Sequence, residues 1–241
     1  KKKEKKKREE KEEKKEKREK KEEGDTKDVE KIRAAAEKAG NDEEWAKALI
    51  TTVQLRMALH GYETSVRYLM DQPWPKAPLA QMTLRLYYGQ TLMRYLNSYS
   101  WEIRQREQVV QKGKVDLKKW TQEQIFAEAQ RVYAEVWAGR GRLGDHPVGL
   151  LGDYINEGSY PKEVRGTLRD AVTYLYVQLL SNTRFWSAKH QNNSYTLDFQ
   201  ALLKGGDGSN AAPKKLQDAG LHPLLKVCGL LDDLEQWHLH K

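Results

Sequence analysis

The chain has 241 residues, 32% of them charged and 38% hydrophobic, so it is long enough to bury a core but is polar for a globular protein. Its net charge of +8 is uneven: residues 1–23 hold 14 Lys or Arg and 9 Glu, a net +5, which leaves +3 (8 − 5) for the rest. This nearly neutral remainder argues against a nucleic-acid-binding domain. No run of about 18 apolar residues predicts a membrane helix, and the single cysteine, Cys228, excludes an internal disulfide framework and a multi-Cys metal site.

Residues 1–23 consist only of Lys, Arg and Glu, so they lack the apolar seam of a coiled coil. Glu and basic residues recur four positions apart, as in Glu4–Arg8 and Glu16–Lys20, which favours an isolated helix. Both a solvated single helix and a disordered charged linker fit this composition. We therefore predict a charged tail or linker over residues 1–24.

Four helices are predicted in the first half of the chain. Asp25 or Thr26 can cap a helix that stops at Gly40, and the next begins at Asn41 or Asp42 and ends at His60-Gly61. A third helix, with Val66, Leu69 and Met70 on its apolar face, ends before Pro73, and Pro78 is well placed as the first residue of a long helix to about Val110. The predicted apolar face of the second helix consists of Trp45, Ala48, Leu49, Thr52, Val53 and Met57.

A break at Lys112-Gly113-Lys114 separates these helices from the second half and suggests a sub-boundary near residues 111–116. Thr121 followed by Gln124 forms a capping-box pattern that starts a helix to about Ala138. Pro147 opens a short helix, and Pro161 opens a strong one with a stripe of Val164, Leu168, Val172, Leu175, Leu179 and Phe185. Residues 187–196 read as irregular, and Pro223 opens a last helix.

No segment alternates apolar and polar residues convincingly, so the predicted fold class is all-α. The succession of helices resembles antiparallel helical hairpins, stacked either in a bundle or in an irregular solenoid. The helices are assigned to one domain over residues 25–241, after the charged tail.

The sequence contains no catalytic signature, which favours a non-enzyme without a cofactor. Residues 139–144 match G-x-G-x-x-G, but a helix precedes the glycines where a dinucleotide site needs a strand. His238 and His240 lie two positions apart and therefore point to different sides of a helix, so we predict no metal site.

Two tracts rich in aromatic residues and arginine provide the candidate partner-binding residues, namely Trp101, Arg104, Arg106, Arg165 and Arg169. Tryptophan, tyrosine and arginine are enriched at the energetic centres of interfaces. The alternative is an inter-helix network in which Arg169 pairs with a carboxylate and its stem packs on an aromatic ring. Both interpretations stay open from the sequence.

Three tracts carry a family resemblance: residues 99–106 (YSWEIRQR), 116–129 (DLKKWTQEQIFAEA) and 160–174 (YPKEVRGTLRDAVTY). They resemble the helical N-terminal region of large bacterial alpha-2-macroglobulin-like proteins, over roughly residues 27–240. The resemblance implies a protease inhibitor of the cell envelope, in which a protease cleaves a bait segment and is trapped. The family's Cys-x-Glu-Gln thioester motif is not present, because Gly229, Leu230 and Leu231 follow Cys228.

From these observations we expect a non-enzymatic helical interaction or scaffold module of a larger envelope protein, with a protein as partner, either downstream domains of the same chain or a protease. The alternative is a free-standing helical-hairpin adaptor that binds a peptide. The resemblance implies a periplasmic or extracellular location, whereas a free-standing adaptor is expected in the cytoplasm.

Overall fold

The computed structural model describes residues 24–107, 116–155, 158–197 and 221–241. These residues are helical or in turns, and their only β pairing is an isolated bridge between Pro147 and Thr167, so the predicted all-α class is confirmed. Whether the predicted hairpins stack as a bundle or a solenoid stays a prediction. The predicted tail at residues 1–23 lies outside the described residues, and so does nearly all of the sub-boundary at 111–116. The chain divides into two compact units after Ser98.

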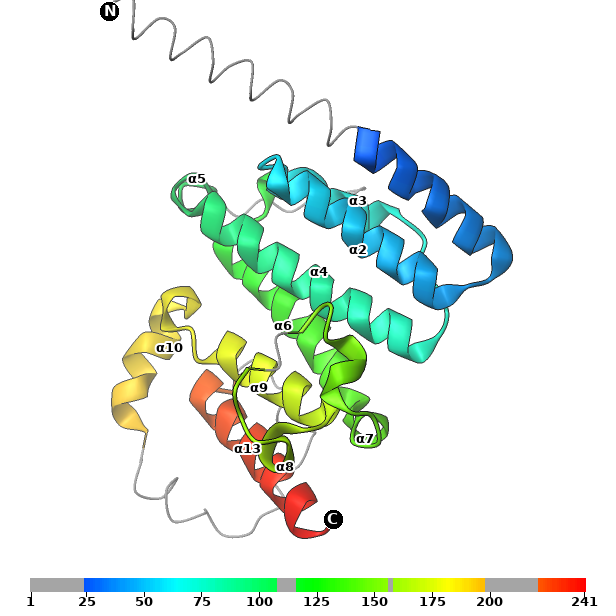
Figure 1. Cartoon of the computed structure of the whole chain (residues 1–241). Helices are drawn as coiled ribbons and strands as arrows, with labels where there is room; N and C mark the ends of the chain where they lie inside the picture. The colour runs from blue at the N-terminus through cyan, green and yellow to red at the C-terminus, as the bar shows by residue number, and fades with distance from the viewer. Residues whose placement is uncertain (1–23, 108–115, 156–157, 198–220) are drawn as a thin grey trace, which may run out of the picture. The chain divides into compact units, whose positions relative to one another are not determined.

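Unit 1 contains a helix over residues 24–39, α2 (Asp42–Ala58), α3 (Tyr62–Asp71) and α4 (Pro78–Ser98), with α2, α3 and α4 packed on one another (Figure 1). The predicted caps are largely correct. Asn41 accepts a hydrogen bond from the Glu44 backbone N–H, and His60 ends α2 with a positive φ of 60°. The first helix already includes residue 24, so the predicted cap at Asp25 or Thr26 is wrong.

The core of unit 1 follows the predicted periodicity of α2. All six residues of its predicted apolar face are buried, together with Ile50. In α3, Val66 and Leu69 are buried as expected, but Met70 is exposed and Tyr68 is buried in its place. The predicted helix from Pro78 ends at Ser98, and a separate short helix, α5 (Ser100–Arg104), follows in unit 2.

Unit 2 is arranged around α9 (Leu168–Leu180), which packs against α6 (Gln122–Ala138), α7 (Arg140–Leu143) and α13 (Pro223–Leu239) (Figure 1). The predicted capping box of α6 is present: Thr121 and Gln124 each accept a hydrogen bond from the backbone N–H of the other. The seven apolar residues that α6 buries are Ile125, Phe126, Ala129, Val132, Tyr133, Val136 and Trp137. The remaining short elements are η1 (Leu117–Lys119), η2 (Val148–Leu151), α8 (Lys162–Arg165), η3 (Thr183–Phe185), α10 (Ala188–Asn193) and η4 (Ser194–Thr196).

The single strong helix predicted from Pro161 is wrong, because the chain turns between α8 and α9. Gly166 makes the turn: a Cβ there would lie 2.1 Å from the carbonyl oxygen of Lys162, so only glycine fits. Thr167 and Asp170 then form a second capping box that restarts the helix. Val164, assigned to the apolar stripe, is exposed as a result. Residues 187–196, predicted to be irregular, form the short helices α10 and η4.

Candidate partner-binding surface

The predicted residues of α5 have different surroundings. The side chain of Trp101 is 75% exposed, and Arg104 is also exposed. Arg106 instead pairs with Glu102 at 2.9 Å between Nη2 and Oε1, and its Nη1 donates to two backbone carbonyls at the η1 turn. Trp101 and Arg104 are therefore accessible to a partner, whereas Arg106 fastens α5 to the following turn.

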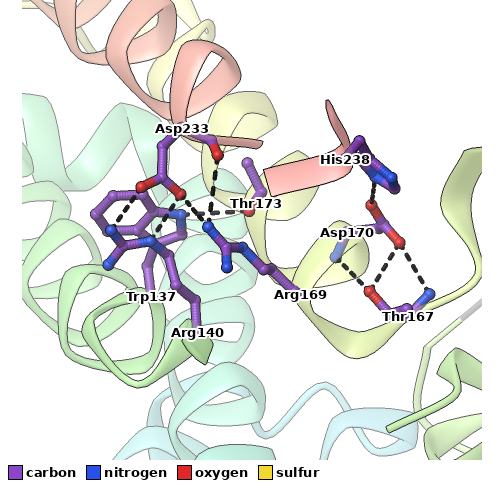
Figure 2. Close-up of polar contacts among 8 residues, drawn as sticks. All are labelled: Trp137, Arg140, Thr167, Arg169, Asp170, Thr173, Asp233 and His238. Atoms are coloured by element: carbon purple, nitrogen blue, oxygen red, sulfur yellow. Dashed lines mark hydrogen bonds and ion pairs between the residues drawn. The ribbon is translucent and has the colours of Figure 1, made fainter. Parts of the chain in front are cut away.

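Arg169 belongs to an internal ion-pair cluster centred on Asp233 of α13 (Figure 2). Arg169 Nη2 lies 2.7 Å from Asp233 Oδ2, while Arg140 donates through Nε and Nη2 to both oxygens at 2.8 and 2.6 Å. Burial raises the pKa of the Asp233 carboxyl, but the hydrogen bonds from Arg140 and Arg169 outweigh it and hold that pKa below its ordinary value. The carboxylate therefore stays ionised between two cations.

Aromatic rings cover this cluster. The Arg140 guanidinium carbon lies 3.6 Å from the centre of the Trp137 ring, and that of Arg169 lies 4.9 Å from the Trp237 ring. Trp137 in turn donates its Nε1–H to Thr173 Oγ1 at 3.2 Å (Figure 2). Helices α6, α7, α9 and α13 are thus tied together around one carboxylate.

A second polar contact, between Asp170 of α9 and His238, holds the C-terminal end of α13. Asp170 is completely buried; its Oδ2 accepts hydrogen bonds from the backbone N–H and hydroxyl of Thr167 at 2.9 and 2.8 Å. Its Oδ1 lies 2.7 Å from His238 Nε2 (Figure 2). The contacts of Arg169 are those of the inter-helix network that the sequence left open. Asp233 is its carboxylate partner and Trp237 is the ring next to it.

Arg165 precedes Arg169 by four residues, and no ion pair with a carboxylate is found for it among the described residues. Its guanidinium carbon lies 3.6 Å from the ring centres of both Tyr160 and Tyr174, so the planar group is stacked between two tyrosines. Its Nε is buried without a hydrogen-bond acceptor, and no carboxylate within the described residues pairs with it. Arg165 is therefore held in position by ring faces, and none of the described carboxylates neutralises its charge.

A hollow of about 550 Å³ lies in unit 2, and we call it the groove. Its apolar surface comes from α6 (Phe126, Ala127, Ala134 and Ala138), α9 (Tyr176), η3 (Phe185) and the start of α13 (Leu221 and Pro223). Sequence reasoning missed the groove, because it assigned Phe126, Phe185 and Pro223 to separate helices and could not show that they meet. The volume is in the range of ligand-binding clefts in proteins.

Charged and polar groups surround this apolar surface. On α6, Arg131 pairs with Glu128 at 2.7 Å and with Glu135. At the opposite side, burial lowers the pKa of His190, and the neighbouring His222 and Lys226 lower it further. Ser187 also lines the groove, but its hydroxyl accepts the His190 backbone N–H as the N-cap of α10.

The other motifs found in the sequence have structural explanations. Residues 139–144 span the junction of two helices, α6 and α7, so no strand leads into these glycines. In the part of the chain that the structure describes, no group of three His, Cys, Asp or Glu side chains could hold a metal ion. None of the described helices is long and apolar enough to cross a bilayer.

Comparison of the chain with protein-family models, with curated proteins and with solved structures finds no match in any of the three.

Proposed function

We propose that this chain is a non-enzymatic helical interaction module that binds a peptide segment of a protein partner in the groove of unit 2. The observation that supports it is a hollow of about 550 Å³ whose lining includes the rings of Phe126, Tyr176 and Phe185 together with charged side chains. An apolar floor with a polar border is how peptide-binding grooves accept an apolar anchor side chain.

The lining of the groove suggests the chemistry of the peptide. Arg131 is paired with two carboxylates of its own helix and Lys226 is buried, so ring and aliphatic surface dominates the lining. An apolar or aromatic anchor side chain matches this lining, because it would cover the aromatic rings.

Selection of displayed random peptides against the full chain tests the proposal. We expect enriched sequences to share an aromatic or aliphatic anchor. Ala127 is exposed and lines the groove, so Ala127→Trp fills the hollow without altering the core and should weaken binding of the selected peptides at least tenfold. Gln178→Trp, on an exposed part of α9 outside the groove lining, is the matched control and should change binding less than twofold.

Failure to enrich any sequence, or equal binding to the Ala127→Trp and Gln178→Trp variants, would remove the groove as the binding site. Robust turnover of a substrate by the purified chain would overturn the non-enzymatic assignment.

The wider context proposed for this module is the helical N-terminal region of an envelope alpha-2-macroglobulin-like protein, and its support is the resemblance of residues 99–106, 116–129 and 160–174. The alternative is a free-standing adaptor with the same groove. Reading the encoding frame past Lys241 and upstream of Lys1 separates them. A signal segment and a β-rich continuation with a bait-like loop favour the first, and start and stop codons close to these residues favour the second.

A further inference from the structure

The stacked arginine of unit 2 forms a second, separate site. Arg165 ends α8, Tyr160 precedes this helix, and Tyr174 lies on α9, so three segments contribute to one stack. The two rings occupy both faces of the guanidinium at 3.6 Å. A planar cation held in this way has few orientations to lose when it binds an anion.

The backbone around Arg165 is also fixed. Gly166 follows directly and makes the tight turn onto the Lys162 carbonyl, and its own carbonyl accepts the Val148 N–H at 2.9 Å. Leu168 N–H donates to the His146 carbonyl at 2.9 Å on the other side of the turn. The stack is therefore attached to the rest of unit 2 by backbone hydrogen bonds as well as by ring contacts.

The charge of Arg165 is not paired within the part of the chain that the structure describes. The contrast with Arg169 is direct, since that guanidinium meets Asp233 at 2.7 Å, whereas in the described residues no acidic side chain pairs with Arg165. Lys162 and Glu163 on the same short helix have opposite charges, so α8 has a net charge of +1, that of Arg165. The buried Nε cannot be reached by a ligand, so the two Nη groups form the edge that remains available.

We propose that the Tyr160–Arg165–Tyr174 stack is a receptor for a carboxylate side chain of a partner protein. The two parallel Nη–H bonds of a guanidinium edge match the two oxygens of a carboxylate. A single guanidinium has one positive charge and one pair of parallel N–H donors, which fits a monoanion. Phosphate groups in proteins are usually bound by clusters of arginines. The exposed side chains of Tyr160 and Val164 provide apolar surface for the neighbours of that acidic residue.

The full chain with ¹⁵N-labelled arginine tests this site by NMR. Because Nε of Arg165 is out of contact with water, its proton is expected to exchange slowly and to give a visible signal, which the variant Arg165→Lys identifies by its loss. Three blocked pentapeptides serve as probes: one with a central Glu between two Leu residues, one with Gln in place of Glu, and one with phosphoserine.

We expect the Glu peptide to shift the Arg165 signal in a saturable manner and the Gln peptide to leave it unchanged at the same concentration. Arg165→Lys keeps the charge but loses the two parallel N–H donors of the guanidinium. It should therefore weaken binding of the Glu peptide at least fivefold, measured on the peptide's own resonances. Arg142→Gln removes an exposed charge elsewhere in unit 2 and should change binding less than twofold.

Several results would overturn the proposal. Equal shifts with the Glu and Gln peptides would show that the carboxylate is not recognised, and equal losses in the Arg165→Lys and Arg142→Gln variants would reduce the effect to net charge. Binding of the phosphoserine peptide more than tenfold tighter than the Glu peptide would assign the stack to phosphate instead. The proposal is independent of the groove, because Ala127→Trp should leave the Arg165 signal and its response unchanged.

Discussion

Replacing Asp233 by Asn tests whether one carboxylate holds α13 on unit 2. Asp233 receives three short hydrogen bonds from two arginines, of which Arg169 is 10% and Arg140 is 16% exposed at the side chain. Removing one partner of a fully buried ion pair costs about 3–5 kcal/mol. Asp233 is 23% exposed and the amide still accepts one hydrogen bond, so we expect a loss of about 2 kcal/mol in the free energy of unfolding.

The measurement is urea unfolding followed by circular dichroism, together with the melting temperature, which should fall by about 4–8 °C for a change of this size. Asp232→Asn is the matched control, because Asp232 is the preceding residue of α13, carries the same charge and is exposed. The control should change the free energy of unfolding by less than about 0.5 kcal/mol.

The effect should also depend on pH, because the folded-state pKa of Asp233 is depressed. The ion pairs stabilise the fold in full above the ordinary Asp pKa of about 3.9, and this contribution is lost as the pH falls through the lower, folded-state pKa. The difference between the wild type and Asp233→Asn should therefore be constant from pH 7 to pH 5 and shrink below about pH 4. Equal stability of Asp232→Asn and Asp233→Asn at pH 7, or a difference that persists at low pH, would refute the reasoning.

Three further predictions concern the turn before α9, the end of α13 and two buried phenols. Gly166→Ala should destabilise unit 2 by more than about 2 kcal/mol, since its Cβ collides with a backbone carbonyl, whereas Gly141→Ala, which meets nothing within 4 Å, should be neutral or slightly stabilising in urea unfolding. His238→Ala removes a donor from a fully buried carboxylate and should cost about 1–2 kcal/mol, with a smaller loss for His238→Gln, which keeps a donor. Burial raises the pKa of Tyr68 and of Tyr176 to about 12, assisted at Tyr68 by a hydrogen bond to a glutamate. The stability from their neutral forms is present below about pH 10 and is lost as the pH rises through 12, so an ultraviolet titration should show phenols that ionise only near pH 12, together with unfolding.

Local signals in the sequence predicted much of the fold. The capping box at Thr121 and the proline at Pro223 gave the starts of α6 and α13 because both act through the backbone of the helix itself. All six residues predicted for the apolar face of α2 are buried, since burial there follows the helical period. The same kind of signal was present at Thr167 and Asp170, yet the continuous apolar stripe favoured a single helix and concealed the turn.

The candidate sites depend on contacts that local signals do not carry. Asp233 is 64 residues from Arg169 and 93 from Arg140 along the chain, and single-sequence periodicity cannot show that α13 returns to α9. The groove likewise requires side chains from four separate elements to meet. Residue type identified arginines and aromatics as important, but only the tertiary structure separates an arginine that holds helices together from one that pairs with no carboxylate among the described residues.

Arg165 and Arg169 make this distinction testable. They are four residues apart in the sequence, but one substitution is expected to affect binding and the other stability. Arg169→Met breaks an ion pair with Asp233 and should cost about 2 kcal/mol, measured by urea unfolding. Arg165→Met keeps an unbranched stem between the tyrosine rings and removes a buried Nε that has no acceptor. The lost cation–π attraction, about 0.5–1 kcal/mol per ring, and the relieved desolvation penalty, about 1–3 kcal/mol, then nearly cancel.

We therefore expect Arg165→Met to change stability by less than about 1 kcal/mol and to abolish binding of the Glu peptide, while Arg169→Met lowers stability and leaves that binding within twofold. A large loss of stability in Arg165→Met with no effect on binding would show that the stack is a structural element and that the uncompensated charge has no ligand. Because each substitution serves as the control for the other, unequal expression or partial unfolding of either variant cannot imitate the expected pair of results.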